Sequence, residues 1–254
     1  MRQRQSGRLH DQVRPVLIEP GYITHPEGSV LFSMGDTRVL CNVSVEQGIP
    51  HWMQSRQLAG GWVTAEYALL PRSTHQRTSR ETLRPRGRTQ EISRLIGRSL
   101  RAAIHLDRLP AVTCTVDCDV LQADGGTRTA AITGGYLALV LALRSAPSTA
   151  EEWLEFLAGQ IAAVSVGKVD GELLVDLDYE EDSTAEADLN LVMNGAGEYI
   201  EIQASAEHGT LNKAELTQAL KLGEQAILEL MEMQRRILAD LGMDGQIFKV
   251  GSAS

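Results

Sequence analysis

The sequence predicts a mixed fold, α+β or α/β, in which two similar halves follow one another without a flexible linker. Short runs of alternating apolar and polar residues, typical of strands, are interspersed with longer runs at helical spacing. A series of strands, helices and strands is followed by a second series that ends in one long helix. The 254 residues, 43% of them hydrophobic, suffice to bury a substantial core, and no short repeat or low-complexity segment divides the chain.

The first half is predicted to begin with strands and to contain one long loop. Alternation predicts strands over residues 13–18, 30–34, 38–45 and 62–70. Gly35-Asp36-Thr37 supplies the tight turn between the second and third of these. Between residues 71 and 88 the apolar periodicity vanishes and Arg, Ser, Thr and Pro dominate. This stretch is predicted to be an extended surface loop, too long to be a mere connector.

Helices follow on either side of one more strand. Apolar residues at helical spacing predict a helix over 91–106, with Arg94, Arg98 and Arg101 as a stripe on the opposite face. Alternation over 113–120 predicts a strand that stops at 124–126, where an Ala- and Leu-rich helix over 129–143 begins.

The second half is predicted as hairpins closed by a long helix. A turn-like stretch over 146–149 and a brief helix over 151–158 precede strands at 161–169, 172–177, 188–193 and 199–204. Asp170-Gly171 and Asn194-Gly195 are the hairpin turns. A long amphipathic helix over 213–241 follows, with Asn212 and Glu215 as its capping box.

The composition limits the classes of protein to which the chain can belong. Three cysteines without a C-x-x-C pair indicate free cytosolic thiols, and the longest apolar run, over 136–143, is far below the ~20 residues that span a bilayer. A soluble, unexported protein is expected. The net charge of −9 argues at first against nucleic acid as a partner.

The charge is strongly segregated, however. Residues 72–108 hold ten arginines against three acids, which makes this segment +7 and leaves −16 for the remainder. Of the 24 basic residues 20 are Arg, the side chain that binds phosphate through two parallel hydrogen bonds. Genomic base composition explains this ratio of Arg to Lys equally well. Salt-bridged or solvated helix faces account for part of the segment. The loop arginines have no acids beside them, so a polyanion is the more economical partner.

Two stretches could carry chemistry. Residues 124–129 (DGGTRT) lie at a strand-to-helix junction, where glycine N–H groups and a helix N-terminus can cradle phosphate; a simple tight turn is an equally good interpretation. The loop is not a Walker A motif.

Residues 170–188 hold nine carboxylates and no Lys or Arg, and among them Asp182 and Asp188 suit Mg²⁺, although a solvated acidic loop is the commoner case. No G-x-S-x-G motif is present, and the six histidines lack metal-ligand spacing.

Together these stretches resemble the ribonuclease PH family of phosphate-dependent 3′ exoribonucleases over nearly the whole chain. The resemblance rests on residues 25–29 (HPEGS), 61–67 (GWVTAEY), 70–74 (LPRST), 87–92 (GRTQEI), 94–98 (RLIGR), 117–130 (DCDVLQADGGTRTA), 180–182 (EED) and 185–188 (AEAD). One departure is the segment 81–87, which is shorter than usual, with Arg and Pro where Lys and Gly are typical. It concerns the path of the loop and not the assignment of Arg88.

The resemblance implies a single domain over 1–254, with halves at about 13–145 and 159–242. It implies an α+β fold of duplicated βαβ units with left-handed crossovers, in mixed sheets packed with helices. Inorganic phosphate, the co-substrate, would be held by Arg88, Gly126, Thr127 and Arg128. Asp182 and Asp188 would be catalytic and would bind Mg²⁺ or Mn²⁺ or support proton transfer. The loop arginines, Arg72, Arg77 and Arg80, would engage tRNA or a neighbouring subunit.

It further implies a cytoplasmic, homohexameric enzyme, a trimer of dimers, which trims the extra 3′ nucleotides of tRNA precursors and releases nucleoside diphosphates. Because one phosphodiester is exchanged for a similarly energetic diphosphate, the reaction should also run in reverse. Two alternatives stand beside this reading: a non-catalytic RNA-binding ring subunit of an exosome-like assembly, and an archaeal-type catalytic subunit that works only with partner chains. The retention of Arg88, Arg128, Asp182 and Asp188 argues against the first.

Overall fold

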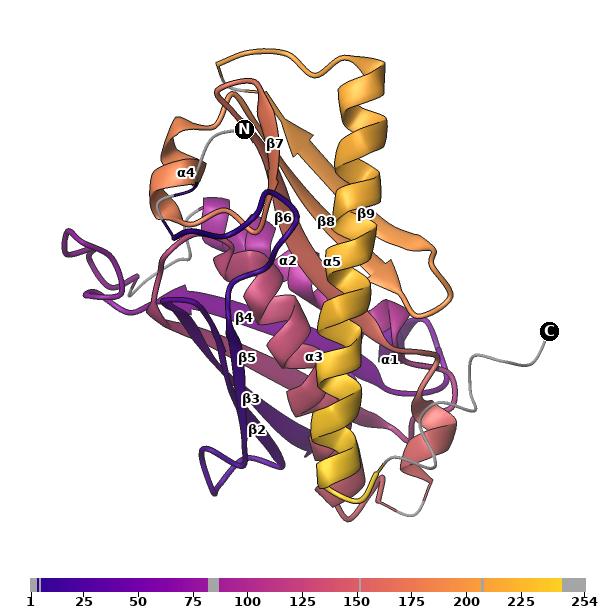
Figure 1. Ribbon diagram of the computed structural model, residues 1–254. Coiled ribbons are helices and arrows are strands. Elements are labelled where there is room, and N and C mark those ends of the chain that lie inside the picture. Colours follow the sequence, from indigo (N-terminus) through magenta and orange to yellow (C-terminus); the bar gives the residue numbers. More distant parts are fainter. Residues whose placement is uncertain (1–3, 5, 82–86, 151, 207, 244–254) are drawn as a thin grey trace.

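The computed structural model describes residues 4, 6–81, 87–150, 152–206 and 208–243, arranged as two sheets packed with helices (Figure 1). The first half contains β1 (Val16–Pro20), β2 (Gly28–Met34), β3 (Thr37–Gln47), α1 (His51–Ser55), β4 (Trp62–Leu69), α2 (Gly87–Ala102), β5 (Val112–Gln122) and α3 (Thr127–Ser145). The second half contains the 3-10 turn η1 (Trp153–Phe156), β6 (Ile161–Val169), β7 (Glu172–Val175), α4 (Tyr179–Thr184), β8 (Ala187–Asn194), β9 (Tyr199–Ser205) and α5 (Lys213–Asp240).

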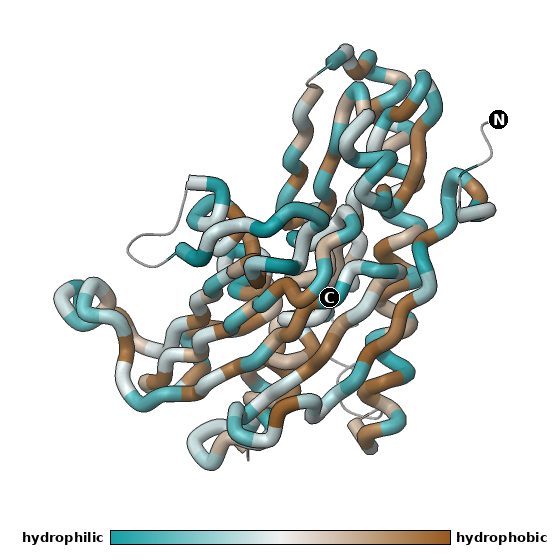
Figure 2. Tube along the Cα trace, turned by 90° about the vertical axis from the view of Figure 1, so that its left-hand side faces the viewer, coloured by the Kyte–Doolittle hydropathy of each residue, from teal (hydrophilic) through white to brown (hydrophobic). Residues whose placement is uncertain are grey.

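The first sheet has five strands in the order β1-β2-β3-β5-β4. Only β4 and β5 pair in parallel, and α2 makes the crossover between them. Helix α3 is buried along nearly its whole length, from Thr129 to Leu143, as expected of a helix that is apolar on all sides. It packs on β2 and β3 of the first sheet and on β6 of the second. The two halves therefore share one core, and the apolar stretches of the chain converge on it (Figure 2).

The second sheet has four strands in the order β7-β6-β8-β9, and its three neighbouring pairs are antiparallel. Strands β7 and β8 both run antiparallel to β6 and therefore parallel to each other. Helix α4 connects them, so the second β-α-β crossover is split by β6, whereas the first joins neighbouring strands. Helix α5 packs against this sheet and begins at the predicted Asn212 capping box.

Most predicted elements are confirmed, but the bounds of α2 differ from the prediction and two short helices were not predicted. Helix α2 begins at Gly87, not at residue 91, and ends at Ala102, not at 106, so Arg88 lies on the helix and not on the preceding loop. Helices α1 and α4 were not expected; both are too short to show a periodicity. Residues 82–86 of the loop segment lie outside the described part of the chain.

The remaining sequence expectations concern cysteines and membranes. The three cysteines are free and buried. No helix in the described part of the chain is both long and apolar enough to cross a membrane.

Candidate active site

The junction between β5 and α3 has the backbone geometry of an anion cradle. Gly125 and Gly126 both adopt left-handed backbone conformations, with φ of 72° and 61°. Gly126 is the N-cap of α3, and no side chain caps the helix there. The first N–H groups of a helix have no partner within it, and together with the helix dipole they favour an anion. The cradle formed by Gly126, Thr127 and Arg128 therefore presents donors and positive potential at one point.

The cradle is packed directly against the turn that leads into α4. A Cβ atom on Gly125 would lie 2.3 Å from the carbonyl oxygen of Leu177 and 2.8 Å from the carbonyl carbon of Asp178. The backbone amide of Tyr179 donates to Asp124 Oδ1 at 3.1 Å. Because these contacts join residues of the two halves, the cradle and the acidic segment keep a fixed relative position.

Tyr67, at the C-terminal end of β4, extends the cradle with a hydroxyl group. Its Oη atom lies 2.8 Å from Thr127 Oγ1. Burial raises the pKa of Tyr67, while the hydrogen bond to Thr127 and the positive charges of Arg88 and Arg128 oppose the increase. Arg88, on the first turn of α2, and Arg128, on the first turn of α3, therefore act on the same hydroxyl.

Arg128 is oriented by groups from two other elements. Its Nη1 donates to Gln203 Oε1 on β9 at 2.8 Å and lies 4.0 Å from Glu91 Oε1 on α2. Gln203 Nε2 in turn donates to Glu91 Oε1 at 2.6 Å. This chain of contacts orients the guanidinium of Arg128, whose side chain is 19% exposed and therefore accessible.

The two predicted carboxylates lie close enough to influence each other. Asp182 projects from α4, and Asp188 lies near the start of β8, where Asn190 donates to its Oδ2 at 3.4 Å. The pKa of Asp182 is raised, first by partial burial of the carboxyl and then by the negative charge of Asp188; Arg128, Arg88 and Arg14 oppose this increase. Asp182 as a residue is nevertheless exposed, so it can be reached from solvent. The structure thus brings Arg88, Arg128, Asp182 and Asp188 into one electrostatic neighbourhood.

Asp182 and Asp188 form a minimal donor set for a divalent cation. Among the described residues, no group of three or more His, Cys, Asp or Glu could hold a metal ion. Two carboxylates suffice for Mg²⁺ when substrate phosphate and water complete the shell, since this ion seldom takes an all-protein cage. The pair fits a cation that binds together with its substrate.

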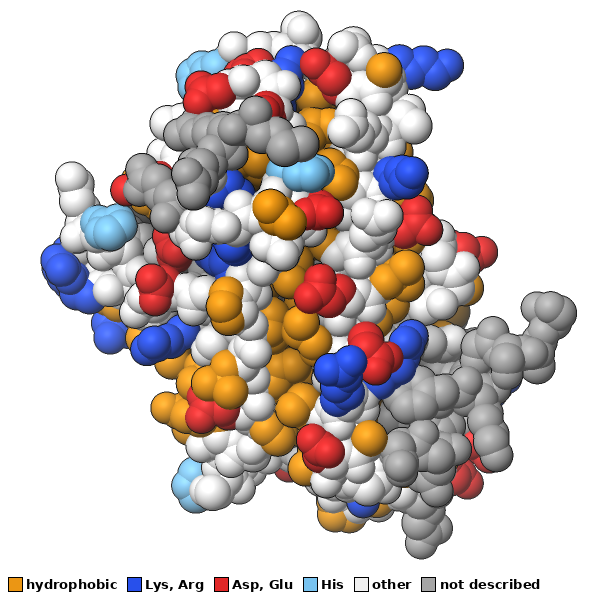
Figure 3. All heavy atoms as spheres, in the orientation of Figure 1, with side chains coloured by type: hydrophobic (Ala, Val, Ile, Leu, Met, Phe, Trp, Pro, Cys, Tyr) orange, Lys and Arg blue, Asp and Glu red, His pale blue; other side chains and the backbone are white. Residues whose placement is uncertain are grey.

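The three loop arginines lie apart from the cradle. Arg72, Arg77 and Arg80 are exposed, and within the described residues none of them forms an ion pair. Basic side chains gather at the left edge of the molecule, over the projecting loop (Figure 3). The loop contacts the acidic segment at one point, where the rings of His75 and Tyr179 lie 5.4 Å apart. The loop therefore borders the site, with its basic side chains free for a polyanion.

Three residues that orient the site were not singled out from the sequence. Tyr67 follows the alternation of β4 and was quoted only as part of the 61–67 motif, and Gln203 follows the alternation of β9. Glu91 was quoted only within the 87–92 motif, as the start of a predicted helix and as a charge. Each owes its role to neighbours more than 35 residues away, which local patterns do not reveal.

A helix N-terminus with two arginines and two carboxylates in one electrostatic neighbourhood suits phosphoryl transfer. Comparison with known sequences makes this specific. The chain belongs to the 3′ exoribonuclease family: domain 1 of that family matches residues 12–144, and domain 2 matches residues 159–226. It is 50% identical over 240 residues to ribonuclease PH of Rhodospirillum rubrum, covering 94% of this chain and 99% of that protein. It is 46% identical over 242 residues to ribonuclease PH of Bacillus pumilus, with the same coverage.

Solved structures share the fold at lower sequence identity. Rice (Oryza sativa) Rrp46 is 20% identical with a TM-score of 0.74, covering 92% of this chain and all of that one. A chain of the Archaeoglobus fulgidus exosome with RNA bound to the active site is 24% identical with a TM-score of 0.75, covering 91% and 92%. The resemblance drawn from the motifs is confirmed. The chain is a phosphorolytic 3′ exoribonuclease of tRNA processing, an enzyme of nucleotidyltransferase type for which phosphate is a substrate.

Proposed function

We propose that Arg88, Arg128 and the backbone amides of Gly126 and Thr127 hold the attacking phosphate, and that Asp182 and Asp188 serve the departing group. The observation that supports this assignment is the shared electrostatic field: the charges of Arg88 and Arg128 act on Tyr67 beside the cradle and also on Asp182 opposite it. An anion held by these arginines would therefore share the electrostatic neighbourhood of Asp182.

In the reaction, an oxygen of inorganic phosphate attacks the phosphorus of the last phosphodiester of the RNA. A new P–O bond forms, the bond from phosphorus to the 3′ oxygen breaks, and the 3′ oxygen takes up a proton. The products are a nucleoside diphosphate and an RNA that is one nucleotide shorter. Arg88 and Arg128 offset the repulsion between the two phosphate groups. Because these donors are already in place, they stabilise the negative charge of the transition state without having to reorganise.

The raised pKa of Asp182 makes its carboxyl suited to deliver the proton to the leaving 3′ oxygen. Mg²⁺ or Mn²⁺, when bound, would neutralise charge on the reacting phosphoryl group. Asp182 and Asp188 would be its protein ligands, and Asp182 would then be ionised, so metal binding and proton delivery are alternative roles of this carboxyl.

The substrates we propose are tRNA precursors and other RNA 3′ ends, with Arg72, Arg77 and Arg80 contacting RNA or a neighbouring subunit. The chain would work as a cytoplasmic homohexamer, a trimer of dimers. We treat residues 1–254 as one functional domain, since the cradle comes from the first half and both carboxylates from the second.

The decisive experiment incubates tRNA carrying extra 3′ nucleotides with the purified protein, with and without inorganic phosphate. We expect shortening only with phosphate, with labelled nucleoside diphosphates as products. Equal shortening without phosphate, giving monophosphates, would contradict phosphorolysis. No shortening at all would favour a non-catalytic RNA-binding ring subunit.

Two variants test the residue assignments against a matched control. Arg88→Ala should raise the KM for phosphate, and Asp182→Ala should lose turnover while still binding RNA. Arg144→Ala is the control, because this arginine of α3 donates to the Leu241 carbonyl at 3.0 Å and its removal also costs a charge and a tether. Full activity of Arg88→Ala or Asp182→Ala would remove that residue from the mechanism.

A further inference from the structure

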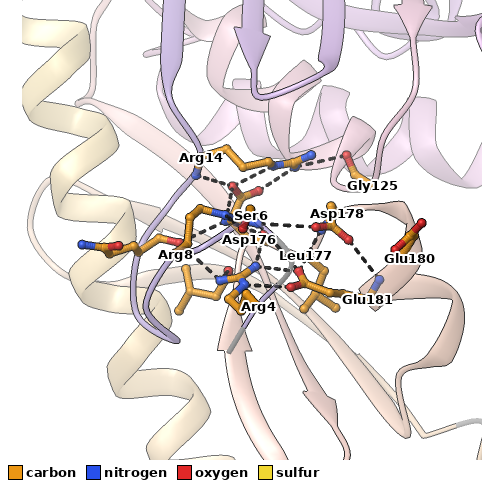
Figure 4. Close-up of polar contacts among 12 residues, drawn as sticks. Arg4, Ser6, Arg8, Arg14, Gly125, Asp176, Leu177, Asp178, Glu180 and Glu181 are labelled. Atoms are coloured by element: carbon orange, nitrogen blue, oxygen red, sulfur yellow. Dashed lines mark hydrogen bonds and ion pairs between the residues drawn. The ribbon is translucent and has the colours of Figure 1, made fainter. Parts of the chain in front are cut away.

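Three arginines of the N-terminal segment converge on the turn that carries α4. Arg4, Arg8 and Arg14 belong to the first half, yet all three contact residues 175–181 of the second half (Figure 4). The cluster is buried: Asp176 is fully buried, and the side chains of Arg4 and Arg14 are 1% and 5% exposed. None of these arginines was singled out from the sequence.

Arg14 ties the turn to the cradle. Its Nε and Nη2 donate to the two carboxylate oxygens of Asp176 at 2.9 and 2.7 Å, and its backbone N–H donates to the same carboxylate at 2.7 Å. On the other side its Nη1 donates to the carbonyl of Asp124, and its Nη2 lies 3.4 Å from the carbonyl of Gly125. One guanidinium therefore bridges the turn before α4 and the loop before α3.

Asp176 has an unusual backbone conformation at the turn before α4. Its φ is 53°, in the left-handed region that residues other than glycine seldom occupy. The conformation turns the chain from β7 toward α4, which begins after the N-cap Asp178. The bidentate contact with Arg14 holds the Asp176 carboxylate in place at this turn. Asp182 follows six residues later, on the helix to which the turn leads.

Arg4 ties α4 itself. Its Nε and Nη2 donate to the two carboxylate oxygens of Glu181 at 2.8 and 2.6 Å, and its Nη1 donates to the Val175 carbonyl at 2.9 Å. Glu181 is the neighbour of Asp182 on the helix. The contact therefore fixes the α4 residue that precedes the proposed catalytic carboxyl.

Arg8 fills the space between the other two. Its Nη1 donates to the Asp176 carbonyl at 3.0 Å, and its Nη2 lies 3.8 Å from Asp178 and 3.7 Å from Glu181 without a hydrogen bond. Buried ion pairs add little net stability compared with apolar packing, because both charges lose their water. Forked, bidentate contacts do fix orientation. The forked contacts of the two buried arginines, Arg4 and Arg14, therefore favour a geometric role over a stabilising one.

We propose that Arg14 and Arg4 are positioning residues of the active site: Arg14 sets the cradle against the turn before α4, and Arg4 sets the orientation of α4 and hence of Asp182. This inference rests on the proposed function, because it assigns phosphate to the cradle and catalysis to Asp182. The two arginines act on different halves of the site, so their replacement has different kinetic consequences.

The test uses Arg14→Lys and Arg4→Lys, which keep the charge and lose the planar fork. Phosphorolysis is measured with phosphate varied at saturating RNA, and the Kd for phosphate is measured separately by calorimetry. Arg14→Lys should raise both the KM and the Kd for phosphate about tenfold or more, the size of effect typical for residues that orient a site. Arg4→Lys should lower kcat by a similar factor and leave the Kd for phosphate within about twofold of the wild-type value.

A purely structural role would give a different pattern. If both variants lost activity only in proportion to the loss of folded protein, with kcat and KM otherwise unchanged, the inference would be overturned. An unchanged Kd for phosphate in Arg14→Lys would likewise overturn it. Arg144→Ala, whose tether lies at the far end of α3, should change neither constant.

Failure of the proposed function can be distinguished from failure of this inference. A wild-type protein that binds phosphate and does not shorten RNA contradicts the function, and the Kd comparison still decides the role of Arg14. If Arg14→Lys does not fold, Asp124→Asn is the second variant. It keeps an acceptor for the Tyr179 amide and removes only the charge that lies 3.4 Å from Arg14 Nη1. A threefold higher Kd for phosphate is expected, and an unchanged Kd overturns the inference.

Discussion

Substitution of Gly125 by alanine tests how closely the phosphate cradle depends on the turn before α4. The residue has a φ of 72°, and a left-handed conformation costs an L-residue about 1–2 kcal/mol. The new Cβ would also lie 2.3 Å from the Leu177 carbonyl oxygen, a backbone atom that moves only if the turn moves. Such overpacking adds about 1–3 kcal/mol. Gly125→Ala should therefore lower the free energy of unfolding by about 2–5 kcal/mol.

Gly171 offers the matched control. Its φ is 79°, and nothing lies within 4 Å of the position that a Cβ would occupy. Gly171→Ala should therefore show the backbone cost alone, about 1–2 kcal/mol. Denaturant unfolding of both variants separates the two contributions, and the difference between them measures the close approach of the two halves.

Activity completes the test, because Gly125, unlike Gly171, lies where the cradle packs against the turn before α4. Gly125→Ala should reduce kcat/KM for phosphate about tenfold or more, a barrier increase of about 1.4 kcal/mol, and Gly171→Ala should leave it unchanged. Equal destabilisation by the two substitutions would refute the close contact. Full activity of a folded Gly125→Ala enzyme would refute the idea that the spacing of cradle and α4 matters for catalysis.

Three further predictions concern Asp117, Tyr67 and Asn212. Burial of the carboxyl, and secondly the charges of Glu66 and Asp119, raise the pKa of Asp117 from 3.8 to about 6. Ionisation of Asp117 therefore lowers the free energy of unfolding, with the full effect above pH 6 and none below pH 3.8, where the carboxyl is protonated in both states. Asp117→Asn should stabilise the protein by about 1 kcal/mol at pH 7.5, allowing for solvent screening, with a smaller gain in unfolding assays at pH 5. Tyr67→Phe removes one hydrogen bond at the cradle and should raise the KM for phosphate about two- to tenfold in steady-state assays; an unchanged KM would separate the hydroxyl from the site. Asn212→Ala breaks the capping box of α5 and should lower Tm by about 2–4 °C in a melting experiment with no change in kcat, because the cap is remote from the cradle.

The sequence was sufficient wherever a local pattern determines structure. Alternation located the strands, Asp170-Gly171 gave a hairpin turn with positive φ at both residues, and the capping box at Asn212 began α5. Helix α4 could not be predicted in this way, since six residues are fewer than two helical turns. The start of α2 was also placed too late, because its polar first turn, with Arg88, lacks the apolar spacing that identifies a helix.

The site residues likewise divide into those that a local pattern reveals and those that only the folded structure reveals. Arg128 and the glycines of the cradle stand out from the sequence because one strand-to-helix junction holds them all. Tyr67, Gln203 and Glu91 cannot be recognised locally, because their contacts cross between β4, α3, β9 and α2. The sequence therefore identifies the proposed phosphate-binding groups better than those that hold them in place.

The acidic run over 170–188 shows why the charge of a segment does not by itself describe its function. Its nine carboxylates were expected to act as one solvated or metal-binding loop. Instead Asp176 and Glu181 are neutralised by buried arginines from the N-terminal segment, more than 160 residues away. On α4 this pairing neutralises Glu181, whereas its neighbour Asp182 lies within the electrostatic influence of Asp188, Arg88 and Arg128. The N-terminal arginines thus neutralise Asp176 and Glu181, two of the nine carboxylates, which the linear distribution of charge could not indicate.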